Sequence, residues 1–451
     1  MARLLTRRTA LLMLAGGLAK LASARAQPAR ERSSKPIVIE EVRIFDGVAD
    51  RLKPGHVLVS DRKIQRVSSA PIAAPAGSTV IRGRGRVLMP GLTDAHWHMT
   101  LAANTLAALE RPDPGLLYAN TVAEAHRTLQ RGFTTVRDMA GPTFGLKDAI
   151  DAGVVPGPRV YPSGAMISQT AGHGDFAPPH VRPPTLGGRP SHLEDLGGVV
   201  VVNGVPEVLA AVRQQLKSGA SQIKLAVGGG VISRFDPIDT LAFTPDELRA
   251  AVQAAGDWGT YVAVHVYTPA GIRRALEAGV RSIEHAHLAD EPSIRLIAEK
   301  GAWLSTQPFE PSDLPLPPEA AAKMKPMLGA WERILGWARQ HGAKVAFGTD
   351  LLFQPGSTSS ENAMLTRFAK VYGSAGALRI ATSGNCELFA ASGPRNPYRE
   401  ARIGVVQEGA WADLLLVEGD PTQDIGVLQD HERNLAVIIK DGNVYKNTTA
   451  G

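Results

Sequence analysis

Two histidines separated by one residue, His96 and His98, end the apolar run VLMPGLTDAHWH at 87–98. Side chains of a strand alternate between its two faces, so the two imidazoles are expected to project from the same face. Neutral imidazoles placed together are typical zinc ligands. Two structural histidines could show the same spacing, and the remainder of the chain distinguishes these interpretations.

Further candidate ligands stand at the ends of later apolar runs, each followed by a turn and a helical pattern. They are Lys224 in the run 222–225, His265 in 262–265, His285 in 280–285 and Asp350 in 344–350. Strands that alternate with helices over roughly 300 residues predict parallel βαβ units, and a (β/α)8 barrel collects functional residues at the C-terminal ends of its strands. These residues are therefore expected to converge with the histidine pair.

The order of these residues, together with several short motifs, resembles the metal-dependent amidohydrolase superfamily. The motifs are MPGLTDAHWH at 89–98, GFTTVRD at 132–138, GPRV at 157–160, IEH at 283–285, GTD at 348–350 and GAWADLL at 409–415. Within the superfamily the chain is most similar to the imidazolonepropionase-related branch, which contains Xaa-Pro dipeptidases and ochratoxin-hydrolysing amidohydrolases. The resemblance implies an α/β fold, a distorted (β/α)8 TIM barrel with a metal centre.

The two chain ends are expected to form a small domain beside the barrel. Residues 37–85 and the tail carry short β-rich runs between Gly and Asp turns, a pattern typical of antiparallel strands. The resemblance implies that 37–87 and 396–451 build one composite β-sandwich and that 88–395 form the barrel. A chain of 451 residues, 44% of them hydrophobic, is long enough for both.

The resemblance also implies which ligands hold each of two metal ions. The more buried metal ion would be held by His96, His98 and Asp350, and the second by His265 and His285, with Lys224 bridging both. A lysine becomes an anionic oxygen ligand only after N6-carboxylation by carbon dioxide; an unmodified Lys224 in a salt bridge is the alternative. Nitrogen and oxygen ligands together suit zinc best, with manganese, cobalt and iron as alternatives.

This ligand set predicts hydrolysis without a covalent intermediate. Two metal ions that share a water lower its pKa toward neutrality, so hydroxide becomes available as the nucleophile. Asp350 can take the proton of that water and pass it to the leaving nitrogen. The second metal ion polarises the amide carbonyl. Asp350 and Lys224 are accordingly the predicted catalytic residues.

Four further residues are candidates for substrate contact. His173 lies in a Gly-His-Gly segment, Tyr267 follows His265 by two residues, and His287 follows His285 by two residues. His287 is also the rival of His285 as a ligand. Arg137 could bind a substrate carboxylate through both of its terminal nitrogens. We therefore expect a small-molecule amide or dipeptide substrate with a free carboxylate, including aromatic amides of the ochratoxin kind.

Other functions are compatible with parts of this pattern. A relative in the same superfamily could hydrolyse a lactone, a cyclic amide or a phosphoester, or deaminate its substrate. The resemblance associates deaminases with the lack of a bridging lysine, so Lys224 argues against deamination. A non-catalytic assembly protein or a periplasmic binding protein would not need all six candidate ligands, and fold alone does not choose among these classes.

Residues 1–26 are predicted to be an export signal, with a positive start, the apolar stretch 10–15 and a small-residue cleavage site at 24–26. Arg7 and Arg8 resemble a twin-arginine signal, and an ordinary secretory signal is the alternative. The apolar stretch is too short to span a bilayer, so no membrane insertion of the mature chain is expected. The predicted location is the bacterial periplasm.

Charge and cysteine content limit the remaining functions. The formal net charge is +6, but residues 1–26 contain five basic residues and no acidic one, so the remainder carries +1. A nearly neutral protein gives no reason to expect nucleic-acid binding. Cys386 is the only cysteine, which excludes an intrachain disulfide. The resemblance implies a homo-oligomer.

Overall fold

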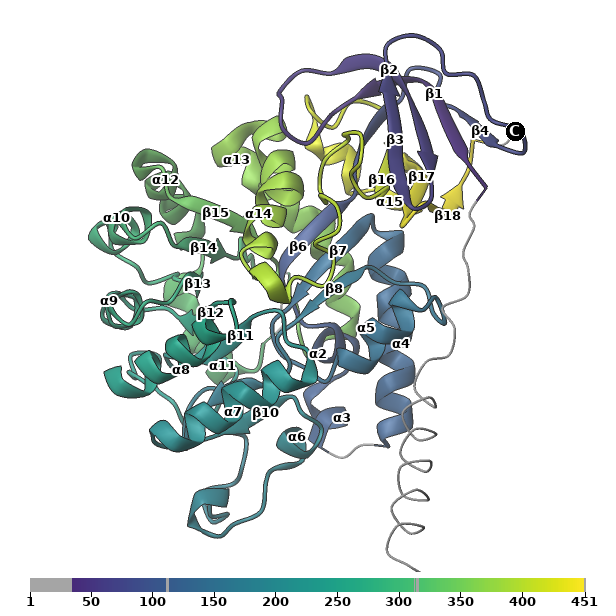
Figure 1. Cartoon of the computed structure of the whole chain (residues 1–451). Coiled ribbons are helices and arrows are strands. Elements are labelled where there is room, and N and C mark those ends of the chain that lie inside the picture. The colour runs from purple at the N-terminus through teal and green to yellow at the C-terminus, as the bar shows by residue number, and fades with distance from the viewer. Residues whose placement is uncertain (1–34, 111–112, 312, 314–315, 450–451) are drawn as a thin grey trace, which may run out of the picture. The chain divides into compact units, whose positions relative to one another are not determined.

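The computed structural model describes residues 35–449 except 111, 112, 312, 314 and 315. The predicted export signal at 1–26 lies outside the described residues. From residue 92 to residue 347, strands and helices alternate along the chain (Figure 1). The strands of this region are β6 (Leu92–Trp97), β7 (Phe133–Asp138), β8 (Arg159–Pro162), β9 (Met166–Ser168), β10 (Val199–Val201), β11 (Ile223–Ala226), β12 (Val262–Val266), β13 (Ser282–His285), β14 (Trp303–Thr306) and β15 (Lys344–Phe347).

These strands are parallel and form a distorted barrel from two sheets. One sheet has the order β6-β7-β8 and the other β10-β9-β11-β12-β13-β14-β15. The N–H of Ser221, before β11, donates to the carbonyl of Pro162 on β8 at 2.8 Å, and the N–H of Asp350, after β15, donates to the carbonyl of His96 on β6 at 2.8 Å. These bonds join both edges of the three-stranded sheet to the other sheet, and the predicted TIM barrel is confirmed.

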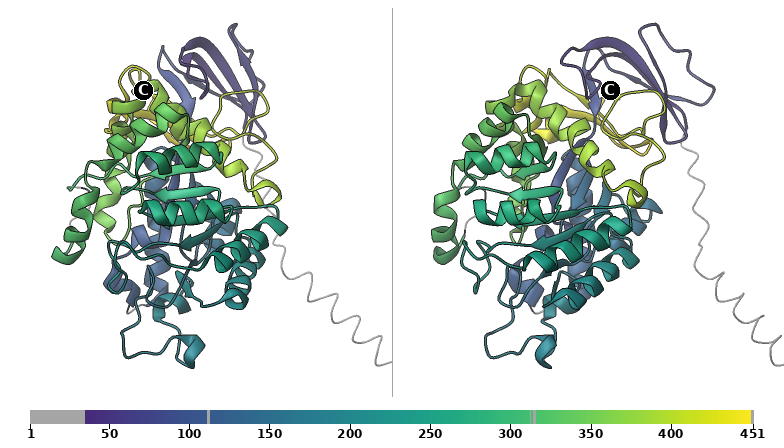
Figure 2. Two further views of the ribbon diagram at one scale, coloured as in Figure 1. Left: turned by 90° about the vertical axis from the view of Figure 1, so that its left-hand side faces the viewer. Right: turned by 60° about the vertical axis from the view of Figure 1, so that its left-hand side comes forward.

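Helices connect the strands and pack outside them (Figure 2). The longer ones are α4 (Pro114–Gln130), α5 (Phe144–Asp151), α7 (Val205–Ser218), α8 (Pro245–Asp257), α9 (Pro269–Glu277), α10 (Glu291–Glu299), α12 (Ala330–His341) and α13 (Glu361–Arg379). The shorter ones are α2 (Met99–Ala103), α3 (Leu106–Glu110), α6 (His192–Asp195), α11 (Pro318–Met324), α14 (Asn385–Ala390) and α15 (His431–Asn434). Sequence signals set several starts: α8 begins with a capping box formed by Thr244 and Glu247, and Asp290 caps α10.

A third sheet is built from both chain ends. Its strands are β1 (Ile37–Ile44), β2 (Lys53–Ser60), β3 (Lys63–Ser68), β4 (Thr79–Arg82), β5 (Val87–Pro90), β16 (Leu414–Val417), β17 (Leu435–Lys440) and β18 (Asn443–Asn447). The order is β18-β17-β16-β5-β1-β2-β3, with β4 beside β1. Residues of both halves, such as Val57 and Ile439, share one hydrophobic core. The prediction that both chain ends build one separate β-structure is therefore confirmed, and its arrangement as a sandwich of 37–87 and 396–451 stays a prediction. Figures 1 and 2 show the purple and yellow strands together.

Gly91 marks the passage from this sheet into the barrel. Its N–H donates to the carbonyl of Asp413 at 2.9 Å. A Cβ atom at this position would lie 2.0 Å from Oγ1 of Thr134, on β7. Only glycine allows the chain to approach β7 so closely, and the next strand, β6, carries His96.

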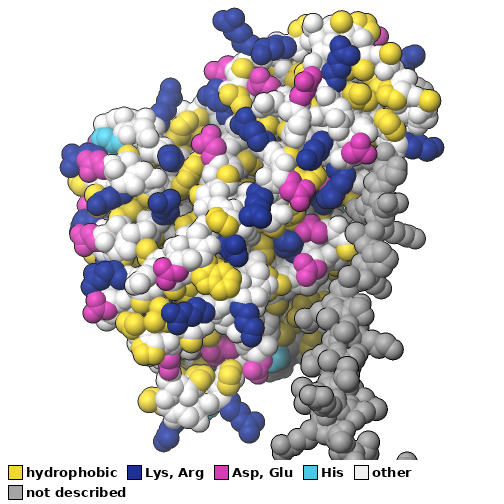
Figure 3. All heavy atoms as spheres, viewed as in Figure 1, with side chains coloured by type: hydrophobic (Ala, Val, Ile, Leu, Met, Phe, Trp, Pro, Cys, Tyr) yellow, Lys and Arg dark blue, Asp and Glu magenta, His cyan; other side chains and the backbone are white. Residues whose placement is uncertain are grey.

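The charge distribution on the surface and the length and polarity of the helices concern two kinds of partner, nucleic acids and membranes. Lys and Arg side chains are interspersed with Asp and Glu over the face seen in Figure 3, which shows no large field of one sign. Among residues 35–449 as described, no helix combines the length and the apolar character needed to cross a bilayer.

Candidate metal centre

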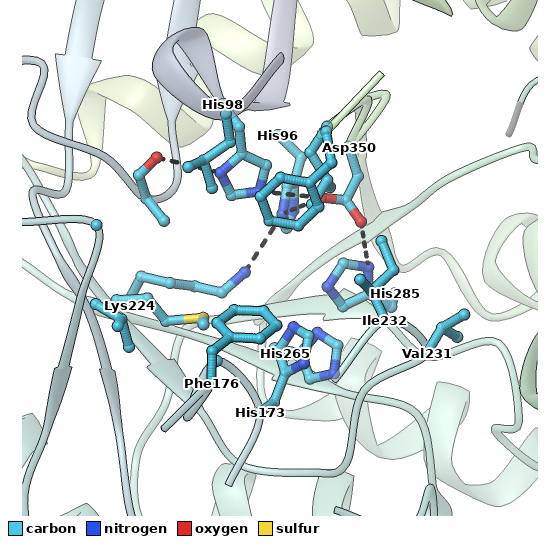
Figure 4. Close-up of a pocket in the computed structure, with 18 of the residues that line it drawn as sticks. His96, His98, His173, Phe176, Lys224, Val231, Ile232, His265, His285 and Asp350 are labelled. Carbon is cyan, nitrogen blue, oxygen red and sulfur yellow. Dashed lines mark hydrogen bonds and ion pairs between the residues drawn. The ribbon is translucent and has the colours of Figure 1, made fainter. Parts of the chain in front are cut away.

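His96 and His98 lie at the end of β6, beside Asp350, which follows β15. Nε2 of His98 is 3.0 Å from Oδ1 of Asp350, and Nε2 of His96 is 3.4 Å from the same oxygen. The two imidazole rings are 5.2 Å apart, and Figure 4 shows both next to the Asp350 carboxylate. The first and the last strand of the barrel thus bring three donor groups to one point.

Lys224 on β11, His265 on β12 and His285 on β13 lie at the same end of the barrel. Nζ of Lys224 is 3.3 Å from Nε2 of His96. Nδ1 of His285 is 3.7 Å from Oδ2 of Asp350, and the His265 and His285 rings are 4.4 Å apart. The structure therefore brings all six predicted ligands into the lining of one pocket.

Two of these residues have left-handed backbone conformations. The φ angle is 75° at His285 and 55° at Asp350. For residues other than glycine such angles cost about 1–3 kcal/mol and persist only where surrounding structure enforces them. At Asp350 the enforcing contact is its N–H bond to His96. Two of the chain's left-handed residues thus stand where the pocket needs donor atoms.

Asp94 ties the strand that carries His96 to the loop that carries Asp350. Its Oδ1 accepts the N–H of His96 at 2.8 Å, and its Oδ2 accepts the hydroxyl of Thr349 at 2.6 Å. Burial raises the pKa of Asp94 to about 6, although these hydrogen bonds act in the opposite direction. Asp94 is therefore a support for the pocket and not part of its lining.

Glu284 and Arg137 form a buried ion pair behind His96. Nη2 of Arg137 donates to both oxygens of Glu284 at 2.9 Å, and Oε2 of Glu284 lies 2.8 Å from Nδ1 of His96. A carboxylate in this position fixes the orientation and tautomer of a ligating imidazole. The structure thereby corrects the expected role of Arg137: its guanidinium is fully buried and holds Glu284, because a buried charge needs a permanent partner.

Burial keeps three of the pocket histidines neutral. Removal from water lowers the pKa of His96, His265 and His285 well below the usual value, and neighbouring cationic groups add to the effect. Burial also lowers the pKa of Lys224 to about 8, although the charges of Glu284 and Asp350 oppose this shift. Neutral imidazoles offer free lone pairs.

The donor set fits a divalent metal ion. His96, His285 and Asp350 each offer one donor atom, and these atoms all lie within 4.8 Å of one another. His98 is in contact with the same carboxylate. Imidazole nitrogens and a carboxylate oxygen at one point are the donors that zinc and several other first-row metals prefer.

The donors form one side of a pocket whose remaining wall contains many apolar side chains (Figure 4). The pocket contains about 790 Å³ of empty space, its open mouth included. Its apolar lining includes Leu101, Met166, Phe176, Val231, Phe309 and Phe353. Phe176 and Phe353 meet edge to face, with ring centroids 6.4 Å apart. A cavity of this size and lining is typical of sites for small organic molecules.

Two of the remaining predicted substrate contacts line the pocket, and one does not. The ring of His173 stacks on His265 at 4.1 Å, and Tyr267 lies 4.8 Å from the same ring. His287 is buried, and its Nε2 is 2.8 Å from the carbonyl oxygen of Gln307. The structure thus places His287 behind the pocket lining, where it contacts the segment that follows β14.

Sequence reasoning missed Glu284 and Gln307, which hold the histidines in place. Strand alternation predicts that Glu284 faces away from its neighbour His285, but the left-handed φ angle at His285 breaks the alternation. Oε1 of Gln307 lies 2.7 Å from Nδ1 of His285. Gln307 directly follows β14, so the rule that polar residues at strand ends form the site could have identified it.

Comparison with known proteins extends these observations. The model of the amidohydrolase family matches residues 87–450. An ochratoxinase from Aspergillus niger is 32% identical over 436 residues, which cover 93% of this chain and 88% of the relative. A prolidase crystallised with N-methylphosphonate-L-proline has a TM-score of 0.84 at 32% identity, over 92% of this chain and 100% of that one. An Xaa-Pro dipeptidase with methionine bound in its active site has a TM-score of 0.77 at 29% identity, over 92% of this chain and 100% of that one.

Proposed function

Because the chain belongs to the amidohydrolase family and is a hydrolase of amide or peptide bonds, we propose a more specific reaction for it. The protein uses two metal ions to cleave the amide bond of N-acyl amino acids or dipeptides that carry a free carboxylate. Ochratoxin A, cleaved to ochratoxin alpha and phenylalanine, is included among the proposed substrates. The observation that carries the proposal is the convergence of six donor residues beneath an apolar wall in one pocket.

The residues of the pocket have distinct tasks in this reaction. Two zinc ions bound by the six donors would supply a Lewis acid for the amide carbonyl and a water with a pKa near neutrality. Asp350 removes a proton from the attacking water and delivers it to the leaving nitrogen. Lys224, whose pKa burial lowers to about 8, is partly neutral at neutral pH. The neutral amine is the form that carbon dioxide carboxylates, so we propose a carboxylated Lys224 as the bridge.

The pocket lining supports an amide with an apolar substituent. Tyr267 has a phenol that can donate to a carbonyl or carboxylate. The rings of Tyr267 and His173 both contact the ring of His265. The aromatic pair Phe176 and Phe353 gives a surface for a large apolar or aromatic group. The names of the relatives, ochratoxinase and prolidase, are consistent with amides of amino acids as substrates.

A panel of carboxylate-bearing amides tests the proposal. N-acyl-phenylalanine, Xaa-Pro dipeptides and ochratoxin A are each incubated with the purified protein as isolated, after chelation, and after zinc is restored. We expect cleavage that disappears on chelation and returns with zinc, with two metal ions per chain by elemental analysis. Faster cleavage of neutral amides or lactones would contradict the proposed substrate class, and stoichiometric binding without product would indicate a binding protein.

Two further proposals concern the protein in the cell. We propose export to the periplasm. A fusion of residues 1–36 to a reporter tests this proposal: the location of the reporter is measured with the natural segment and with Arg7 and Arg8 replaced by lysine.

We also propose a homo-oligomer. Light scattering of the mature protein tests this proposal by measuring its molar mass.

A further inference from the structure

The segment between β11 and α8 leaves the barrel and returns to it as a closed loop, residues 228–241, which we name the β11 loop. An antiparallel bridge between Gly228 and Leu241 closes its base. A Cβ atom at Gly229 would lie 1.9 Å from the carbonyl oxygen of Pro237, so only glycine lets the two arms of the loop lie so close together. The β11 loop therefore has a defined conformation.

A buried carboxylate fixes the shape of the β11 loop from inside. Oδ2 of Asp236, a residue that is 1% exposed, accepts the N–H of Gly230 at 2.6 Å and the hydroxyl of Ser233 at 2.8 Å. The carbonyl oxygens of the same three residues converge on a single atom outside the loop. That atom is Nζ of Lys323, on α11, which donates to them at 3.0, 3.1 and 2.7 Å.

These three bonds use the whole hydrogen-bonding capacity of Lys323. A lysine ammonium has three hydrogens and no acceptor, and the three carbonyl oxygens of the β11 loop accept them. The charge of the donor strengthens these bonds relative to bonds between neutral groups. Lys323 is therefore committed to the loop and is not free to bind a substrate carboxylate.

The same face of α11 also makes apolar contact with the β11 loop. Ala320, Lys323 and Met324 are spaced by three and four residues, so their side chains share one face of the helix. Ala320 and Met324 belong to a hydrophobic cluster that includes Val231 and Ile232 of the loop. Because apolar contact is not directional, the bonds of the ammonium group are what fixes the alignment of the loop on the helix.

Both of the aligned elements supply side chains to the pocket. Val231 and Ile232 from the β11 loop and Met324 from α11 line it, and Figure 4 labels the first two. Lys323 lies outside this lining. It therefore acts on a bound molecule only through the apolar side chains that it aligns.

We propose that Lys323 is a positioning residue that gives the pocket its selectivity for large apolar substrates. Its three bonds hold Val231 and Ile232 in one alignment with Met324, so a large apolar group meets a fixed wall. A substrate too small to reach that wall gains nothing from Lys323. This inference rests on the proposed amide hydrolysis and adds the residue that sets the preferred size of the substrate.

The test compares the wild type with Lys323→Met, which keeps an apolar stem but has no ammonium group, on two amides. N-benzoyl-phenylalanine is apolar on both sides of the amide, and N-acetylglycine is small on both sides. Contacts with the wall are the same in the bound substrate and in the transition state, so KM for N-benzoyl-phenylalanine should rise about tenfold while kcat stays within about twofold. For N-acetylglycine both values should stay within about twofold. A loss of equal size for both amides, or for neither, would overturn the inference.

Two further variants separate the ammonium group from general destabilisation. Lys323→Arg keeps a cation with several N–H donors and should raise KM for N-benzoyl-phenylalanine less than about threefold. Lys325→Met, at the exposed lysine that follows α11, is the matched control and should resemble the wild type. Circular dichroism and the melting temperature establish that each variant is folded, and Lys323→Gln replaces Lys323→Met if that variant does not fold.

Hydrogen exchange tests the positioning independently of turnover. Mass spectrometry of peptides that cover residues 228–241 reports the opening of the β11 loop. Loss of the ammonium bonds should make these peptides exchange at least about fivefold faster in Lys323→Met than in the wild type and in Lys325→Met, with the barrel strands unchanged. An unchanged rate in the β11 loop would overturn the inference. If the wild-type protein cleaves neither amide, the proposed function fails, and hydrogen exchange still decides whether Lys323 holds the loop.

Discussion

Two buried clusters of charged and polar side chains differ in how their partners are matched. Where the barrel meets the sheet of the chain ends, Arg159 on β8 contacts Asp413 and Asp441, each at 2.7 Å. In the pocket, the single carboxylate of Asp350 faces several histidines and Lys224. In the junction cluster the charge of the arginine is paired with carboxylates of the protein. In the pocket cluster there are more donor atoms than protein groups to pair with them, which is the condition for binding a metal ion.

The protonation of the two clusters differs in the same way. Burial disfavours the charge of Arg159, but the carboxylates of Asp413 and Asp441 outweigh it and raise the arginine pKa. In the pocket, burial prevails and lowers the pKa of His96 and of Lys224. The junction is therefore ionised and the pocket largely neutral, so we expect substitutions at the junction to affect stability and substitutions in the pocket to affect turnover.

The largest effect is expected for Asp350→Asn. The amide keeps the shape of the side chain but cannot accept a proton from water, so kcat should fall by at least about 10³-fold. The measurement is kcat on N-acyl-phenylalanine at matched zinc content, with circular dichroism and the melting temperature as evidence of folding. A folded, zinc-loaded variant with more than about a tenth of wild-type activity would contradict the catalytic role of Asp350. The pocket would then no longer differ from the junction in its effect on turnover.

The junction should show the opposite behaviour in Arg159→Met. This change leaves Asp413 and Asp441 buried without their cation, which should lower the free energy of unfolding by about 3 kcal/mol. The kcat of the folded fraction should stay unchanged because Arg159 lies outside the pocket lining. Urea unfolding and kcat at low temperature measure the two properties separately.

The matched control for this variant is Arg43→Met. Arg43 also contacts a carboxylate, that of Asp420 at 2.8 Å, but its side chain is 41% exposed. Exposed pairs contribute about 0–1 kcal/mol, so the control should be close to wild type. Equal losses in both variants would show that burial does not distinguish the junction from an ordinary surface pair.

A smaller effect is expected from acid. Burial raises the pKa of Asp441, but the charge of Arg159, with a hydrogen bond from Arg62, outweighs burial and lowers it below its usual value. A folded-state pKa that is depressed stabilises the protein above the unfolded pKa, and this contribution is lost as the pH falls through the folded pKa. The stability difference between wild type and Asp441→Asn should therefore shrink from about pH 6 to about pH 3. Urea unfolding at each pH measures it, and a constant difference would contradict the assignment.

The same two clusters separate what the sequence could predict from what it could not. The barrel follows from the alternation of strands and helices, and the six donors were expected together because each stands at or near the end of a strand. The GPRV and GAWADLL motifs carried the resemblance without any predicted contact. The structure shows that their charged residues, Arg159 and Asp413, pair with each other across the junction. A contact between residues 254 positions apart leaves no local pattern in a single sequence.

The misplaced and missed residues have equally physical causes. Arg137 was expected to bind substrate because a free guanidinium suits a carboxylate. The sequence did not reveal its partner Glu284, because the left-handed φ angle at His285 breaks the strand alternation from which side-chain directions are predicted. Ser233 and Asp236 lie in a loop that has no hydrophobic periodicity, and only the fold brings them to His173. Strand ends can therefore be read from sequence, whereas the residues that support them require coordinates.

The smallest effect is expected on the apolar side of the pocket, where neither charge nor donor atoms are involved. Phe176→Ala removes one ring of the edge-to-face pair with Phe353, which should lower kcat/KM for aromatic amides such as ochratoxin A about three- to tenfold. For N-acetylglycine, which cannot reach the ring, the value should be unchanged. Tyr118→Ala, at an aromatic residue that is 44% exposed outside the pocket lining, is the matched control. If Phe176→Ala slowed both substrates equally, the ring would act on the donor cluster itself and not on the substrate, and the pocket could no longer be divided into a reacting side and a selecting side.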